Sequence, residues 1–211
     1  MRHEREGGGG QGAGNWEEGG VRAGREGGSG APLRPIAIFA DESCLGNGRE
    51  GSNPGGAAGV IEYVSPSGRL SRHDYWVSEP GTTNNRMALR SAIEALRGIS
   101  RKGARFRVSF TSDSQYLVKG MSEWVEGWEE RGWRKKDGPI LNLELWQELV
   151  EEARRHGVKW QWVRGHVGHP QNEYANDLAV RAAKEQSSSN GIVASHFDEW
   201  LAAEREKGRV K

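Results

Sequence analysis

Three polar segments of this chain each follow an apolar stretch and contain side chains that can hold a metal ion. Asp41 and Glu42 follow one such stretch and Asp113 follows another, while residues 164–177 form a third segment that includes Asn176. A single Asp after a strand is more often a turn residue or a helix cap. Carboxylates that converge at one end of a sheet repel one another unless cations lie between them. The three segments together therefore indicate a metal site.

The donor atoms in these segments indicate the kind of metal. Carboxylate and amide oxygens are the ligands of hard cations such as Mg²⁺ or Mn²⁺. The chain has one cysteine, Cys44, which excludes an internal disulfide and a cysteine-based zinc cluster. Two ions about 3.5–4 Å apart can activate a water and stabilise the leaving oxygen in phosphodiester cleavage. We therefore expect two Mg²⁺ or Mn²⁺ ions.

The elements that must position these residues follow from hydrophobic patterning. Short apolar or alternating stretches predict strands at 36–40, 57–64, 70–77, 106–110 and 158–163. Apolar stripes and capping residues predict helices at about 84–100, 114–128, 142–156 and 170–185. Strands joined by tight turns pair antiparallel, whereas strands separated by helices pair in parallel. We expect an α/β fold in which a five-stranded mixed sheet carries helices on both faces.

Both ends of the chain differ in composition from this central region. Gly accounts for 12 of the first 30 residues, so we predict that residues 1–33 form a disordered, solvated extension. The folded domain is expected at 34–186. A Ser-rich stretch then opens a linker and short tail at 187–211, in which an apolar stripe from Phe197 to Leu201 is expected to cap the core or fray rather than bind a partner.

Charge and hydropathy exclude some classes of protein. The 30 basic and 29 acidic side chains leave a net charge of +1, so a nucleic acid would have to be bound by a local basic patch. No stretch approaches the ~20 apolar residues of a membrane span, and the N-terminus lacks the apolar core of a secretion signal. Together with the single cysteine, these features favour a cytoplasmic protein, which we expect to be a monomer without membrane contact.

Four segments resemble the signature segments of bacterial type 1 ribonucleases H, in the same order along the chain. They are residues 39–47, 83–87, 111–116 and 165–173, and the likeness extends over about residues 36–185. The resemblance implies a ribonuclease H-like fold and metal-dependent endonucleolytic hydrolysis of the RNA strand of an RNA–DNA hybrid. A nuclease domain of a reverse transcriptase or transposase is a weaker hypothesis, because the chain contains no polymerase or DNA-binding segment.

The resemblance also implies four acidic metal ligands, of which this chain keeps two. The first and third match Asp41 and Asp113, but the second is replaced by Ala88 and the fourth by Asn176. One interpretation is a catalytically weak or inactive module that still binds hybrids. The other is that different residues replace the missing ligands. Cleavage of a labelled hybrid with Mg²⁺ or Mn²⁺ distinguishes the two interpretations.

Glu42 favours the second interpretation. The adjacent Asp-Glu pair resembles the one that type 2 ribonucleases H carry on their first catalytic strand, so we predict that Glu42 replaces the missing helix Glu. Neighbouring strand residues face opposite sides, so Glu42 reaches the site only if the strand bends or ends there. Asn176 offers an amide oxygen as the fourth ligand and is preferred to Asp177, which lies about 100° further round the helix.

Other residues match family positions with a role in proton transfer or substrate binding. His166 lies in a Gly-flanked loop and matches the family His that moves protons near the leaving group. Asn84, Asn85 and Gln115 match contacts in the minor groove of the hybrid, where 2′-hydroxyls distinguish RNA from DNA. Thr83 matches a position that holds a phosphate of the DNA strand.

An aromatic and basic stretch resembles the handle with which the family grips the DNA strand. Its residues are Trp124, Trp128, Arg131, Trp133, Arg134, Lys135 and Lys136. The alternative is that Trp124 and Trp128, which are four residues apart on one helix, only pack against each other. Asn47 matches a further substrate contact, although an insertion makes Asn53 an equal candidate.

Overall fold

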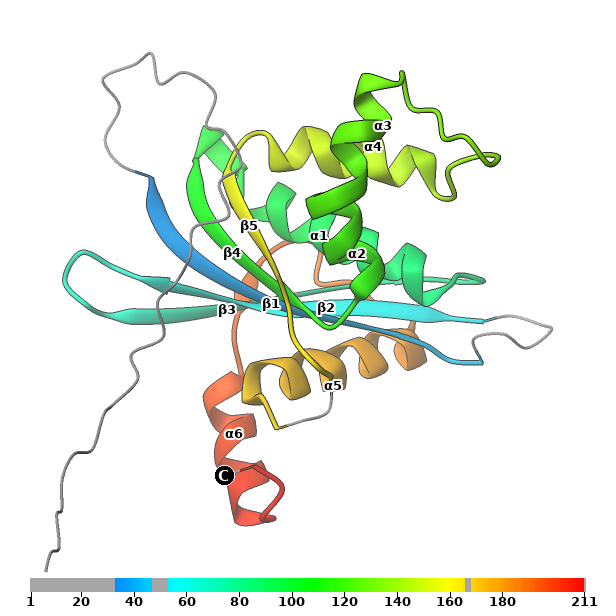
Figure 1. The fold of residues 1–211 in the computed structure, drawn as a ribbon. Helices are drawn as coiled ribbons and strands as arrows, with labels where there is room; N and C mark the ends of the chain where they lie inside the picture. The colour runs from blue at the N-terminus through cyan, green and yellow to red at the C-terminus, as the bar shows by residue number, and fades with distance from the viewer. Residues whose placement is uncertain (1–32, 47–52, 166–167, 211) are drawn as a thin grey trace, which may run out of the picture. The chain divides into compact units, whose positions relative to one another are not determined.

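The computed structural model describes residues 33–46, 53–165 and 168–210, so the Gly-rich extension, Asn47 and His166 lie outside the described residues (Figure 1). The strands are β1 (Arg34–Cys44), β2 (Gly55–Val64), β3 (Leu70–Glu79), β4 (Phe106–Ser112), β5 (Gly157–Trp162) and β6 (Val193–Ala194). The helices are α1 (Asn84–Ile99), α2 (Gln115–Lys119), α3 (Val125–Glu130), α4 (Leu143–Ala153), α5 (Pro170–Glu185) and α6 (Phe197–Glu206). A short 3₁₀ turn, η1 (Arg101–Gly103), follows α1, and a π-helical turn, η2 (Gly120–Trp124), joins α2 to α3.

The strands form one mixed sheet in the order β5-β4-β1-β2-β3-β6. β1 pairs in parallel with β4, and β4 with β5, while the other neighbours pair antiparallel. The predicted α/β class and mixed sheet are confirmed, but the predicted count of five strands is wrong. The sixth strand lies in the stretch predicted as a linker, where it pairs with His73 and Asp74 of β3. Two residues are too few to show a periodicity, so only this pairing identifies them as a strand.

Helices cover both faces of the sheet, as predicted. Helices α1 to α4 lie on one face, and α5 and α6 lie on the other (Figure 1). Ile38 of β1 packs with Leu89 of α1 and Trp146 of α4 in the larger core cluster. Tyr174 of α5 and Phe197 of α6 pack in a second cluster on the opposite face. None of the described helices is long and apolar enough to cross a membrane.

Small residues of β2 let α5 lie close against the sheet. A Cβ atom added to Gly56 would lie 2.2 Å from the carbonyl oxygen of Ala179 in α5. No side chain fits at that distance, so Gly is the residue that permits this approach. The same helix contacts the neighbouring strand β1. This packing brings the first half of α5 beside the end of β1 that carries Asp41.

Candidate active site

Three carboxylates meet at one edge of the sheet. Asp41 and Glu42 lie in β1, and Asp113 follows directly after β4. One carboxylate oxygen from each residue lies within 4.8 Å of the other two. Gly165, which follows β5, lies against this cluster, because a Cβ atom there would be 2.3 Å from Oδ2 of Asp113. The polar segments that the sequence singled out therefore converge, as far as the described residues reach.

We expected Glu42 to reach the cluster if β1 bends or ends there, and β1 does not end at Glu42. β1 continues to Cys44 and stays paired with β2 along this stretch. Its parallel pairing with β4 stops at Ala40 and Ser112. The sheet is therefore open on one side of Asp41 and Glu42. Side chains that start from opposite faces of β1 can meet Asp113 in this gap.

Glu42 lies on the face of the sheet that α1 covers. Ala40 packs in the same core cluster as Ala88 and Leu89 of α1, and residues two apart on a strand share a face. Ala88, which stands where the resemblance implies a Glu, is 1% exposed. Glu42 therefore brings a carboxylate from the strand to the face on which the helix position offers only a methyl group.

The pKa values of Asp41 and Glu42 are raised in this cluster. Burial, followed by the charge of Asp113, raises the pKa of Asp41 to about 8, and Asp41 is 4% exposed. Burial and then the charge of Asp41 also raise the pKa of Glu42 well above its usual range, against a hydrogen bond with Ser114. Such a cluster of oxygen donors suits a hard divalent cation. The residues present therefore fit the metal ions that the family implies.

Asn172 is a residue of this site that sequence reasoning missed. Its side chain is 2% exposed, and Nδ2 donates to Oδ2 of Asp41 at 2.9 Å. The backbone N–H of Glu42 donates to the other oxygen, Oδ1 of Asp41, at 2.7 Å. Both carboxylate oxygens of Asp41 are thus held by donors, which sets the plane of the carboxylate. The available signal was that Asn172 precedes Asn176 by four residues and so shares its helix face.

This contact also separates Asn176 from Asp177. Because Asn172 reaches Asp41, the face of α5 that includes Asn176 is directed toward the carboxylates. Asp177 is exposed, and its Oδ2 accepts a hydrogen bond from Nε1 of Trp200 in α6 at 2.9 Å. The geometry therefore favours Asn176 over Asp177 as a ligand, which stays a prediction.

The predicted minor-groove and phosphate contacts lie around the starts of α1 and α2. Thr83 is the N-cap of α1, where its side chain accepts from the backbone N–H of Arg86 at 3.3 Å. Asn84 and Asn85 follow in the first turn, and Oδ1 of Asn84 is buried without a hydrogen-bond partner among the described residues. Gln115 is the exposed first residue of α2. The four residues therefore lie at the starts of two helices, α1 and α2.

The residues of the predicted handle are exposed or half-buried, and its tryptophans pack against other rings. Trp124 and Trp128 have ring centroids 5.9 Å apart, and Trp128 also contacts Trp146 of the core. The same two side chains line a hollow of about 470 Å³ together with Arg131 and Lys135. Trp133 packs against the core, while Arg134 and Lys136 are exposed. Packing and substrate contact are therefore compatible here.

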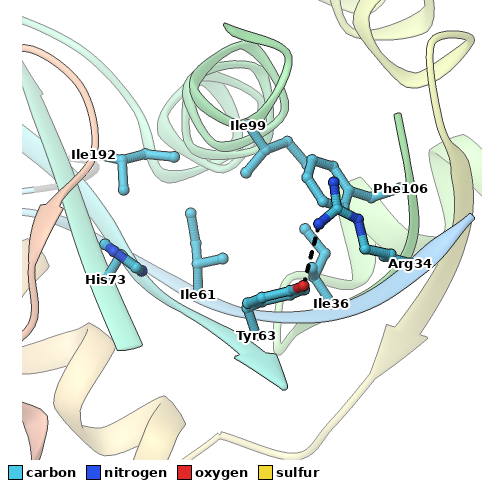
Figure 2. A pocket seen from close by; sticks show the side chains of 8 residues that line it. All are labelled: Arg34, Ile36, Ile61, Tyr63, His73, Ile99, Phe106 and Ile192. Carbon is cyan, nitrogen blue, oxygen red and sulfur yellow. Dashed lines mark hydrogen bonds between the residues drawn. The ribbon is translucent and has the colours of Figure 1, made fainter. Parts of the chain in front are cut away.

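A second hollow is lined by residues at the start of β1, whereas the carboxylates lie toward the other end of this strand. Figure 2 shows the side chains that line this hollow. Its volume is about 260 Å³, and its walls are isoleucines and aromatic rings, including Ile36 and Phe106. Arg34 at its border donates from Nη1 to the hydroxyl of Tyr63 at 3.3 Å. Its lining contains no carboxylate, so it has no donor set for a hard cation.

Comparisons with known proteins agree with this geometry. The sequence model of the RNase H family matches residues 34–184. The chain is 43% identical over 156 residues to a ribonuclease H of Pelobacter propionicus, covering 74% of this chain and 88% of that protein. It is 45% identical over 174 residues to a ribonuclease H of Chelativorans sp., covering 82% of this chain and all of that protein.

One solved structure is especially informative about the site. It is the crystal structure of LC9-RNase H1, described as "a type 1 RNase H with the type 2 active-site motif". This chain is 57% identical to it, with a TM-score of 0.81 and coverage of 87% of this chain and 88% of that chain. The match over most of the chain, the shared fold and the converging carboxylates agree: the chain belongs to the ribonuclease H family.

Proposed function

We propose that this ribonuclease H hydrolyses the RNA strand of RNA–DNA hybrids with an altered set of metal ligands. Asp41, Glu42, Asp113 and Asn176 would hold two Mg²⁺ or Mn²⁺ ions. The observation that carries the proposal is the meeting of three carboxylates within 4.8 Å, with Glu42 as the third. The type 2 active-site motif described for LC9-RNase H1 supports it. Three acids and one amide leave enough negative charge for two divalent ions beside a phosphate.

Divalent ions bound there would supply an activated water and charge stabilisation at the leaving oxygen. The protein's part is to orient the ligands and the substrate. Each carboxylate oxygen of Asp41 accepts one hydrogen bond, and the two bonds together fix the orientation of the carboxylate. Gly165 lies against Asp113 and precedes His166 in the sequence. His166 would then exchange a proton at the leaving oxygen, since imidazole titrates in the useful range.

Substrate selection would come from the predicted contacts beside the cluster. Asn84, Asn85 and Gln115 would read the minor groove, and Thr83 would hold a phosphate of the DNA strand. Asn47 or Asn53 would add a further contact. The handle would grip the DNA strand through these residues: Trp124, Trp128, Arg131, Trp133, Lys135 and Lys136. A cytoplasmic location and a monomeric state stay predictions.

The test is cleavage of a labelled RNA–DNA hybrid by Glu42→Gln, which keeps the size of the side chain and removes its charge. Loss of a metal ligand is expected to lower the rate at least about 100-fold at ordinary Mg²⁺ concentration. Asp177→Asn is the matched control, because it removes an acidic group that contacts Trp200 instead. Normal cleavage by Glu42→Gln would exclude Glu42 as the substitute ligand. The alternative function is a module that binds hybrids without cutting them, and it is favoured by the lack of a carboxylate at Ala88. Failure of the wild-type chain to cleave with either metal would support that alternative.

A further inference from the structure

A third hollow lies close to Asp113, and its lining residues other than Gln115 have no role in the site described so far. Its volume is about 380 Å³, and it lies between the end of β5 and the helical segment α2–η2. Trp162 forms one wall, and Gln115, Val118 and Lys119 of α2 form another. Glu123 lines both this hollow and the one at the handle. The hollow therefore occupies the surface between the carboxylates and the handle.

Trp162 presents an exposed ring at a fixed position. It is the last residue of β5 and is 48% exposed, although most large apolar side chains of the described residues are buried. Its Nε1–H donates to the backbone carbonyl oxygen of Asp113 at 3.0 Å. Trp160, two residues earlier, packs against Phe110 in the core. The strand thus orients Trp162 toward α2, and the hydrogen bond ties its indole to a predicted metal ligand.

Lys119 supplies a positive charge to the same hollow. It lies one helical turn after Gln115, so the two side chains share a face of α2. It is exposed and forms no ion pair within the described part of the chain. An apolar ring and an available ammonium group in one depression match the two parts of a nucleic-acid backbone. The ring can cover a sugar, and the ammonium group can meet a phosphate.

We propose that Trp162 and Lys119 form a subsite for the sugar–phosphate backbone of the RNA strand, next to the cut. This proposal rests on the proposed function. The cut strand is the one that must lie against the metal ligands, and Trp162 is bonded to one of them. Bases of a hybrid stay paired, so the hollow meets backbone rather than a base. The subsite would extend the grip on the substrate from the carboxylates toward the handle.

The test measures binding separately from cleavage. Fluorescence anisotropy of a hybrid in Ca²⁺ gives the Kd, and gels of the same samples report any cleavage. Lys119→Ala should weaken binding about fivefold and lower the slope of log Kd against log salt by about one. Trp162→Ala should weaken binding about fivefold, whereas Trp162→Phe should stay within about twofold because the ring remains. In Mg²⁺ each effect should appear mainly in KM.

Matched controls distinguish a backbone subsite from a general loss of charge or of folding. Lys184→Ala removes an exposed Lys from α5, on the other face of the sheet, and should leave the Kd and the salt slope unchanged. A hybrid with one neutral methylphosphonate in the RNA strand near the cut should bind wild type and Lys119→Ala equally. If the two proteins instead bind equally only when the methylphosphonate is in the DNA strand, Lys119 contacts the DNA strand and the proposed RNA subsite is wrong. A Trp162→Ala variant with lower kcat and Tm but an unchanged Kd would reduce Trp162 to a support for Asp113. Binding without cleavage would count against the proposed function and leave the subsite standing.

Discussion

Asp41→Asn should make the metal-free protein more stable, although it should abolish cleavage. The carboxyl of Asp41 has a pKa of about 8 in the folded protein, against an ordinary value of 3.8. At pH 7 the carboxyl of Asp41 is ionised in the unfolded chain but mostly protonated in the folded chain, so its ionisation stabilises only the unfolded state. That difference costs the folded state about 4 kcal/mol at most, from about 1.36 kcal/mol per pH unit. An Asn has no such cost.

The substitution also disturbs the two hydrogen bonds that Asp41 accepts. An amide has one oxygen, so one donor must be re-paired, at a cost of about 1–2 kcal/mol. Asn172 can limit this cost, because its Oδ1 has no partner among the described residues and can accept from the new amide. The net gain is about 2 kcal/mol. For a domain of this size that corresponds to a rise in Tm of about 4–8 °C.

The assay is thermal unfolding in EDTA, followed by circular dichroism between pH 4 and pH 8. The pKa of Asp41 is raised in the folded state, so wild type is penalised increasingly as pH rises from about 4 to 8. The two proteins should be equally stable at about pH 5, where this penalty equals the cost of re-pairing the hydrogen bond, and wild type should be the more stable one at pH 4. Mg²⁺ should stabilise wild type more than Asp41→Asn, because it compensates the carboxylates. Asp137→Asn, at an exposed position, is the charge control. An Asp41→Asn protein no more stable than wild type at pH 7.5, or a gain that is equal at pH 4, would refute the reasoning.

Three further changes test the site and its supports. Asn172→Ala should raise the Mg²⁺ concentration needed for half-maximal cleavage about 10–100-fold, because the carboxylate of Asp41 loses a donor that orients it. Saturating Mg²⁺ should restore part of the cleavage rate of this variant. An unchanged Mg²⁺ titration would contradict the role of Asn172. Ala88→Glu should restore cleavage to a Glu42→Gly protein, measured on a labelled hybrid, because it returns a carboxylate to the α1 face; failure to rescue would mean that the two positions do not serve one metal site. Phe197→Ala should lower the free energy of unfolding by about 3–5 kcal/mol in urea titrations, because its ring is 2% exposed in the cluster beneath α5; a loss below about 1 kcal/mol would show that α6 is dispensable.

The family, the α/β class and the identity of the unusual acid can all be read from the amino-acid sequence. Asp41 and Asp113 follow strands separated by helices, and such strands pair in parallel, so their carboxyl ends share an edge of the sheet. The Glu beside Asp41 and the Ala at position 88 are visible without coordinates. Each of the four motifs is a continuous stretch of the chain, so the motifs and their order can be recognised without coordinates.

The way in which these residues meet depends on contacts between distant parts of the chain. Glu42 reaches the cluster because β4 stops pairing at Ser112 while β1 continues, and a register is a property of two strands together. Asn172 was missed because its partner is 131 positions away in the chain. β6 was missed because a two-residue strand exists only through its pairing with β3. Trp162 likewise gains its orientation from a backbone carbonyl on another strand end, a contact that no local pattern encodes.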